Sequence, residues 1–356
     1  MSITSTAGLA VLWPCRTLLA RGRSPSDSAR GGVAACIAHI LATSEASVIV
    51  RRPTEADAPA AAELVAALEM HFVGESEMRT SDLLDEWRQL ELSRDIWLVE
   101  LDGRLAGYGA LFTKRHAFAD ICVHPDAWNH GVGSHLVELV ETDARRRGIG
   151  LLRNGVLDND RRAHALLHAR GYRIVRHFYR MAIELDAPPP APEWPEGLRS
   201  SVYDSREVRA FHAALEEAFE DEWDHEPESF DDWRRRRLEA PNVDPTLWFA
   251  VKDGEEIAAT AVCDRDRFGM GWVGAIGVRK PWRRRGLGLA LLRHCFVELY
   301  GRGQRVIGLG VDAENPTGAT RLYERAGMRV VWSAALFEKE LADCNVPKTM
   351  GSYLGL

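Results

Sequence analysis

The 356-residue sequence lacks the features that mark membrane, secreted and metal-binding proteins. Its apolar runs are shorter than the roughly 20 residues that a helix needs to cross a bilayer. It has six cysteines, but none is paired as C-x-x-C and none lies in a short Cys/His cluster. No basic segment precedes an apolar one near its start, so no signal peptide is expected. These absences predict a reduced, cytoplasmic protein without a metal, in which Cys122 and Cys263 are small buried residues.

Lysine is also scarce, since only five of the 45 basic residues are lysine and the other 40 are arginine. This excess of arginine, together with much alanine and glycine, is typical of a bacterial genome with a high GC content. The net charge is −7, whereas a general nucleic-acid-binding protein usually has a basic face. The composition therefore predicts no nucleic-acid partner and no membrane partner.

The length suits two domains of ~150 residues each, and an internal repeat supports this division. Residues 96–107 and 247–258 share one pattern: an apolar run, an Asp-Gly dipeptide (Asp102-Gly103 or Asp253-Gly254) and a second apolar run. Asp-Gly between two strand-like runs is typical of a β-hairpin. We therefore expect a hairpin at the corresponding place in each half.

The same series of elements follows each hairpin. We expect a strand, a glycine-bearing turn, a helix, a further strand, a short helix that ends at glycine and a last strand that closes the half. In the two halves these are strands 119–123 and 274–278, helices 135–147 and 290–300, strands 151–157 and 305–311, helices 163–171 and 317–327, and strands 178–185 and 330–336. Gly286 follows Gly131 by 155 residues and Gly327 follows Gly171 by 156, which indicates a duplication.

A proline-rich stretch, Asp186 to Pro195, separates the two repeats and fits neither a helix nor a central strand. We therefore divide the chain into a flexible N-terminal extension, a first domain, a linker, a second domain and a tail. Their bounds are 1–46, 47–186, 187–197, 198–343 and 344–356.

The most informative segment lies in the second repeat, where a strand ending at Val278 turns through Arg283-x-x-Gly286-x-Gly288 into a helix. Backbone N–H groups and a helix N-terminus then point at one spot, which forms an anion site suited to phosphate. The glycines allow a close approach of the ligand, and the arginines add positive charge. This arrangement repeats in degraded form in the first half.

The segment resembles motif A of the GNAT acetyltransferases, whose strand-to-helix loop binds the pyrophosphate of acetyl-CoA. The resemblance implies an α/β fold with two tandem GNAT units, each a twisted mixed sheet flanked by helices and related by a pseudo-twofold. It implies that Ile276, Gly277 and Val278 bind the pantetheine arm and the acetyl carbonyl. The pyrophosphate would be held by Arg283, Arg284, Arg285, Gly286, Leu287, Gly288, Leu289 and Ala290.

A second segment, 311–328, resembles motif B of the same family in Asn315, Tyr323 and Gly327, with Met328 in place of the usual aromatic residue. The resemblance implies that Asn315 ties the strand end to the cofactor region. It also implies that Tyr323 donates a proton to the departing CoA thiolate, because a phenol can supply the proton that this leaving group requires.

The first half departs from both motifs. Trp128 stands where the loop has an arginine or glutamine, and Leu167 stands where the second half has Tyr323. The first half is therefore predicted to be structural, or a remnant that still binds acetyl-CoA. Its possible cofactor site comprises Val123, Gly131 and Gly133.

The general base is less evident. Tandem GNAT enzymes of the mycothiol synthase type resemble this chain in layout and have a glutamate base where Trp272 stands here. Residues 216–233 contain ten carboxylates among aromatic residues, and are either a solvated acidic face or part of a site for a cationic amine. We hypothesise that Glu222 or His225 acts as the base, directly or through water.

Together these residues predict an enzyme that transfers acetyl from acetyl-CoA to a primary amine of a small molecule in its C-terminal domain. A mycothiol synthase, which acetylates a cysteinyl amine on an aminosugar–inositol scaffold, is the close alternative. A non-catalytic pair of acyl-CoA-binding domains is the alternative from another class, and a protein acetyltransferase is also compatible, because a fold does not fix the acceptor. No residue pattern identifies the amine or an oligomeric state.

Overall fold

The computed structural model describes residues 47–341, except 75, 77, 114–115 and 240–242. The predicted N-terminal extension and C-terminal tail lie outside the described residues. The first half contains β1 (Val48–Arg51), α2 (Ala58–Val73), α3 (Thr80–Trp87), α4 (Leu92–Asp95), β2 (Ile96–Leu101), β3 (Arg104–Phe112), β4 (Ala117–Val123), α5 (Val132–Arg146), β5 (Leu151–Leu157), α6 (Arg161–Ala169) and β6 (Arg173–Glu184). The second half contains β7 (Leu198–Val202), α7 (Val208–Phe219), α8 (Phe230–Arg237), β8 (Trp248–Asp253), β9 (Glu256–Arg267), β10 (Met270–Val278), α9 (Leu287–Gly301), β11 (Val306–Asp312), α10 (Ala319–Arg325) and β12 (Arg329–Glu340).

The duplication predicted from the sequence is confirmed by this order of elements, and the fold is mixed α/β. The segment 185–197, which includes the predicted linker, has no helix or strand. Both hairpins form, with a two-residue loop at Asp102-Gly103 in the first half. In the second half the loop is Gly254-Glu255, one residue later than predicted. Cys122 and Cys263 are buried, as predicted.

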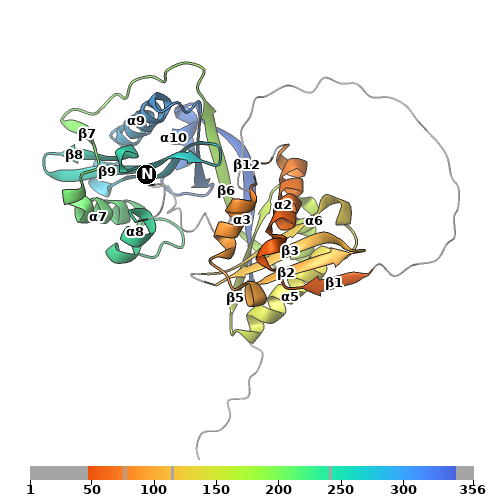
Figure 1. Cartoon of the computed structure of the whole chain (residues 1–356). Coiled ribbons are helices and arrows are strands. Elements are labelled where there is room, and N and C mark those ends of the chain that lie inside the picture. The colour runs from red at the N-terminus through yellow and green to blue at the C-terminus, as the bar shows by residue number, and fades with distance from the viewer. Residues whose placement is uncertain (1–46, 75, 77, 114–115, 240–242, 342–356) are drawn as a thin grey trace, which may run out of the picture.

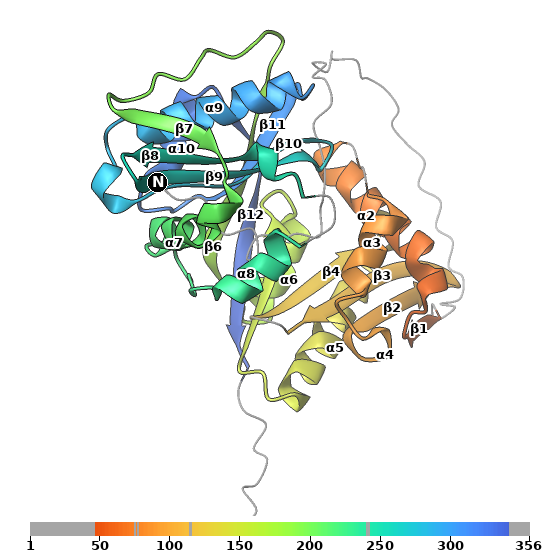
Figure 2. The same ribbon diagram turned by 60° about the vertical axis from the view of Figure 1, so that its left-hand side comes forward.

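Within the described residues, twelve strands form one sheet, in the order β1-β2-β3-β4-β5-β12-β6-β11-β10-β9-β8-β7. The strands β1 to β6 correspond in order to β7 to β12. Replacing each strand in this list by its counterpart gives the same list in reverse order. The two halves are therefore related by a pseudo-twofold whose axis passes between β12 and β6, which lie together at the junction in Figure 1. Helices cover both faces of each half, as α7 and α9 do on opposite sides of the strands in Figure 2.

The prediction that each half is closed by its own last strand is wrong, because the two halves exchange these strands. β6 belongs to the first repeat but pairs antiparallel with β11 of the second, along Val306–Asp312. β12 belongs to the second repeat but pairs antiparallel with β5 of the first, from Leu151 to Leu157. Either half alone would therefore leave an interior strand with an open edge, which is an unfavourable state for a sheet.

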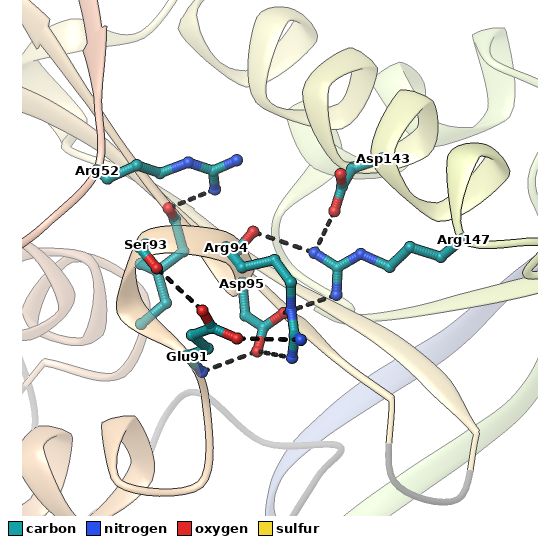
Figure 3. Close-up of polar contacts among 8 residues, drawn as sticks. Arg52, Glu91, Ser93, Arg94, Asp95, Asp143 and Arg147 are labelled. Atoms are coloured by element: carbon teal, nitrogen blue, oxygen red, sulfur yellow. Dashed lines mark hydrogen bonds and ion pairs between the residues drawn. The ribbon is translucent and has the colours of Figure 1, made fainter.

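The outer end of the first half is fixed by an ionic cluster between α4 and the C-terminal end of α5 (Figure 3). Arg147 donates to Asp95 at 2.6 Å and also pairs with Asp143. Burial alone would raise the pKa of Asp95, but hydrogen bonds from Arg94, the Glu91 backbone and Arg147 lower it to about 2. The carboxylate thus stays charged at neutral pH, and its ion pairs hold α4 against the end of α5 within the first half.

Candidate active site

The centre of the candidate site is a gap between two parallel strands. β10 and β11 pair only at Gly271–Ile307 and Trp272–Gly308. Beyond these residues β10 continues beside β9 as far as Val278, while β11 continues beside β6. The two strands therefore diverge toward their carboxyl ends, and backbone groups of β10 on the β11 side are left for a ligand. Ile276, Gly277 and Val278, predicted to bind pantetheine, lie on this diverging part.

The predicted phosphate loop follows β10 directly. Its backbone is left-handed at Arg284, with φ +62°, and at Gly286, with φ +83°. This reversal lets α9 begin at Leu287, three residues earlier than predicted from the sequence. The first N–H groups of a helix have no partner within it, so those of α9 are directed at the space beyond the loop. Leu287 and Gly288 supply these N–H groups, whereas those of Leu289 and Ala290 in the same turn already donate to the Gly286 carbonyl, at 3.1 and 3.2 Å.

Arg283 has a structural use that the sequence did not reveal. Its guanidinium donates to the Val278 carbonyl at 2.9 Å, to Asp221 at 2.7 Å and to the Ala218 carbonyl at 3.2 Å. It thus ties the loop to the end of α7. Hydrogen bonds from Arg283 and Lys280 lower the pKa of Asp221. The exposed Arg284 and Arg285 are therefore better placed than Arg283 to meet a phosphate.

A close approach between α7 and β10 fixes the other wall of the gap. A Cβ atom at Gly277 would lie 2.6 Å from the Cβ of Ala218, so only glycine allows this contact. The end of α7 is thereby held against the strand that is predicted to carry the thioester. The residues that follow α7, among them Glu222, are brought to the site in this way.

Tyr323 lies in α10 and is almost fully buried, at 1% exposure. Its hydroxyl has no hydrogen-bond partner among the described residues. Burial first, and the charge of Glu222 second, raise the pKa of Tyr323 well above its ordinary value. The phenol therefore keeps its proton at physiological pH and is a donor that lacks an acceptor.

Two of the other predicted residues contact each other, and one of them, Glu222, is near enough for its charge to act on Tyr323. The Asn315 side chain donates to Glu222 at 3.4 Å, and the Asn315 oxygen accepts from the Thr317 backbone at 2.9 Å. Tyr323, Asn315 and Glu222 are thus brought together, although they are distant in sequence. His225 is directed elsewhere, since its Nε2 lies 3.6 Å from Glu216 of α7.

The acidic segment 216–233 does not provide the free aromatic pocket that its composition indicated. Trp233 is buried in the core, and Trp223 already packs against Arg153 and Arg176. Many of the carboxylates form ion pairs with arginine or lysine, for example Glu228 with Arg236. The interpretation of a cation–π site built from these rings is therefore wrong for Trp233, and the acidic side chains have mostly structural partners.

The first half keeps the backbone of the phosphate loop while changing its side chains. Asn129 has φ +64° and Gly131 has φ +80°, close to the values in the second half, and α5 begins directly at Val132. Trp128 donates from Nε1 to the Val123 carbonyl at 3.1 Å, as Arg283 does to Val278. The tryptophan thus replaces the structural hydrogen bond of the arginine.

The residue that contacts Trp128 also differs from Asp221, the partner of Arg283 in the second half. The helices α2 and α7 begin 150 residues apart, so His71 corresponds to Asp221 and Phe72 to Glu222. The ring of His71 lies 4.6 Å from that of Trp128, in the place of the ion pair between Asp221 and Arg283. The side chain of Asn159 donates to the Phe72 backbone carbonyl at 3.0 Å. Aligning the two helices with each other in the sequence is enough to show that His71 and Trp128 replace Asp221 and Arg283.

The sequence profile of the Acetyltransferase (GNAT) family matches the chain twice, at residues 62–172 and at 208–328. The chain belongs to the GNAT acetyltransferase family. It is 31% identical over 239 residues to the mycothiol acetyltransferase of Thermobispora bispora, covering 65% of this chain and 79% of that protein. The mycothiol acetyltransferase of Catenulispora acidiphila is 30% identical over 309 residues, which cover 78% of this chain and 94% of that one.

Solved structures agree with this assignment. A GCN5-related N-acetyltransferase from Sphaerobacter thermophilus is 36% identical, with a TM-score of 0.75, and the match covers 83% of this chain and 96% of that one. A tandem GNAT protein from the clavulanic acid biosynthesis pathway is 17% identical, with a TM-score of 0.65 over 83% of this chain and 99% of that one, and shows the shared fold. This GNAT protein is therefore an acyltransferase built from two tandem GNAT units.

In the part of the chain that the structure describes, no group of three or more His, Cys, Asp or Glu side chains is arranged to hold a metal ion. Within the same residues, no helix combines the length and the apolar character that crossing a membrane requires.

Proposed function

We propose that the C-terminal half of this GNAT protein transfers an acetyl group from acetyl-CoA to a primary amine of a small molecule. One observation carries the proposal: the buried Tyr323 hydroxyl lacks a partner in the described structure, in a site where the charge of Glu222 acts on it and Glu222 is bonded to Asn315. An orphaned buried donor has a large cost unless a ligand completes it. The sulfur of a thioester in the gap between β10 and β11 is such a ligand.

The residues present suit acetyl-CoA. The diverging part of β10 offers backbone groups at Ile276, Gly277 and Val278 to an extended pantetheine chain. The left-handed loop and the first turn of α9 offer N–H groups to a pyrophosphate, with the exposed Arg284 and Arg285 nearby. When bound, acetyl-CoA supplies the activated acetyl group as a thioester.

The chain's own residues then divide the proton transfers. An alkyl amine with a pKa near 10 is mostly protonated at neutral pH, so attack on the acetyl carbon requires a proton acceptor. Glu222 accepts the proton of the ammonium, directly or through water, and the neutral amine then forms the new C–N bond. Tyr323 gives its proton to the CoA sulfur as the C–S bond breaks, so that one proton is taken up and one is released. The nitrogen loses its second proton as the tetrahedral intermediate collapses, and that proton restores the phenol of Tyr323.

The first half lacks both proton-transfer groups. Leu167 occupies the position of Tyr323, and Phe72 occupies that of Glu222. Its loop retains the left-handed backbone at Gly131, so we keep Val123, Gly131 and Gly133 as a possible second cofactor site without catalysis. This distribution favours a single catalytic site in the chain.

The relatives' name makes a mycothiol-type acceptor a specific second candidate. The resemblance to tandem GNAT enzymes places a glutamate base at the position of Trp272, which is buried here, with its ring 5.0 Å from Phe268. With a mycothiol-type substrate, Glu222 would therefore have to act as the base instead. A release screen should include a cysteinyl aminosugar–inositol compound together with polyamines, aminosugars and peptides.

We expect that screen to show thiol release from acetyl-CoA with at least one amine and none without an amine. Free CoA is measured with a thiol reagent while each amine is varied. Tight acetyl-CoA binding without release across all these classes would refute the proposal and favour the non-catalytic alternative. Release with peptide N-termini or lysine alone would move the acceptor from small molecules to proteins.

The different surroundings of Glu222 and His225 allow a test of which of them is the base. We expect Glu222→Gln to lower kcat at pH 7 by about 100-fold, because a positioned base contributes on that order. His225→Gln should leave kcat within about twofold, since His225 lies against Glu216. The measurement is the pH–rate profile of both variants, in which the low-pH fall of kcat should change only for Glu222→Gln. An unchanged profile for both would reject both candidates.

A further inference from the structure

The segment that follows α7 leaves its own half and lies on the other one. Trp223 packs against the apolar cluster that Phe118 and Phe178 of the first repeat form with Leu336 of the exchanged strand β12. The guanidinium carbon of Arg153, on β5, lies 4.9 Å from the centre of the Trp223 ring. Arg176, on β6, lies 5.1 Å from it. The residue directly after Glu222 is thus held between side chains of the N-terminal repeat.

The next residue adds an ionic anchor. Asp224 has a left-handed backbone, with φ +59°, and its carboxylate lies 2.6 Å from Nη1 of Arg153 and 2.8 Å from Nε2 of His116. Arg153 is itself buried, and its Nε donates to Glu338 at 3.1 Å. Because Glu338 is also buried, the arginine is fixed from both sides.

This anchor joins a segment of the second half to the first half. Although the fold is nearly symmetric, the corresponding residues do not form such a contact in the opposite sense. The counterparts of Arg153 and Glu338 in the second half are Gly308 and Ala182, which pair with each other across β11 and β6. The counterparts of Trp223 and Asp224 are Val73 and Gly74, which carry no charge. Gly74 has the same left-handed backbone as Asp224, with φ +91°.

The anchor is thus present for the segment that contains Glu222 and absent for the segment that contains Phe72. The same half also holds Tyr323, whereas the other has Leu167. The ionic contact therefore occurs in the same direction as the proton-transfer residues, which a role in positioning them requires. Glu222 lies between two fixed points, the anchor on its C-terminal side and Asn315 at its own carboxylate.

We propose that Arg153 of the N-terminal half is a positioning residue for catalysis, which holds Glu222 in place through Asp224 and Trp223. The inference rests on the proposed role of Glu222. It gives the N-terminal half a task in the reaction at the C-terminal site: its strands β5 and β6 hold the segment that carries the base. A small displacement of a catalytic group lowers the rate strongly, because the reacting atoms must be aligned.

The test is a double-mutant cycle on the full chain with Asp224→Asn and Glu222→Gln. Asp224 is partly exposed, so the asparagine removes the ion pair at little risk to folding. We expect Asp224→Asn to lower kcat about tenfold with an unchanged KM for acetyl-CoA, and to cause no further loss when Glu222 is already glutamine. Arg153→Lys, which keeps the charge but not the fork-shaped geometry, should give an intermediate kcat.

Asp244→Asn is the matched control, since Asp244 also pairs with an arginine, Arg302, at 3.0 Å and has similar exposure, but belongs to another part of the second half. It should leave kcat unchanged. If Glu222→Gln lowers kcat but Asp224→Asn does not, or if the two losses simply multiply, the positioning role is refuted while the base survives. If Glu222→Gln itself has no effect, the proposed base fails, and the positioning proposal fails with it.

Discussion

Replacing Tyr323 by phenylalanine is expected to lower kcat for acetyl transfer by about 100-fold to 1000-fold. The change removes one oxygen from a buried ring and keeps the rest of the side chain, so the fold is retained. Burial raises the pKa of Tyr323 well above 10, so the phenol keeps its proton throughout the pH range of an assay and is always ready to donate. Without it, the CoA thiolate must leave unprotonated or wait for water.

The measurement combines thiol release with calorimetric titration of acetyl-CoA. The dissociation constant should stay within about twofold, because the loop and β10 bind the donor. Tyr172→Phe is the matched control: this tyrosine of the first half is also buried, at 3% exposure, and burial raises its pKa. Unchanged kcat in Tyr323→Phe would mean that the proton comes from another group, and the role of Tyr323 would be lost.

The second large effect is expected at the phosphate loop. Gly286→Glu should weaken acetyl-CoA binding at least 100-fold. A side chain at φ +83° adds backbone strain of about 1–3 kcal/mol, and a carboxylate there repels the pyrophosphate. A Cβ atom at this glycine would meet nothing within 4 Å, so a steric clash is not the cause.

Two glycines of equal backbone conformation serve as controls for this variant. Gly131→Glu makes the same change in the first half, at φ +80°, and should leave one binding site intact in calorimetry. Gly303→Glu, at φ +93° beyond the other end of α9, adds the same strain with no site nearby. Binding that survives Gly286→Glu would move the cofactor to the first half. Binding that is lost equally in Gly303→Glu would show strain alone to be responsible.

Much of the architecture was predictable because its signals are local. Asp102-Gly103 forms a hairpin loop whose central residues both have positive φ, which this dipeptide adopts readily. The glycines at 131 and 286 mark the turn into a helix because they take a left-handed backbone that most residues avoid. Tyr323 and Asn315 were predicted from the resemblance to motif B, because together with Gly327 they match its pattern.

The candidate site was only partly predictable, because its contacts join residues far apart in the chain. Arg283 was expected to meet phosphate, yet it bonds to Asp221 and the Ala218 carbonyl, more than 60 residues away. His225 and Glu222 are three residues apart and were equal candidates on sequence. The turn after α7 directs them to different partners, Glu216 and Asn315.

The sequence by itself determined that the chain is a duplicated acyltransferase whose second half keeps the loop and the tyrosine. Only the tertiary structure decided that β6 and β12 change places and that Arg153 of one half holds Asp224 of the other. The physical reason is the duplication itself: β5 and β11 are similar strands, so the local pattern of β6 suits either edge. The choice is made by packing near the pseudo-twofold, where Arg153 on β5 has Gly308 on β11 as its counterpart.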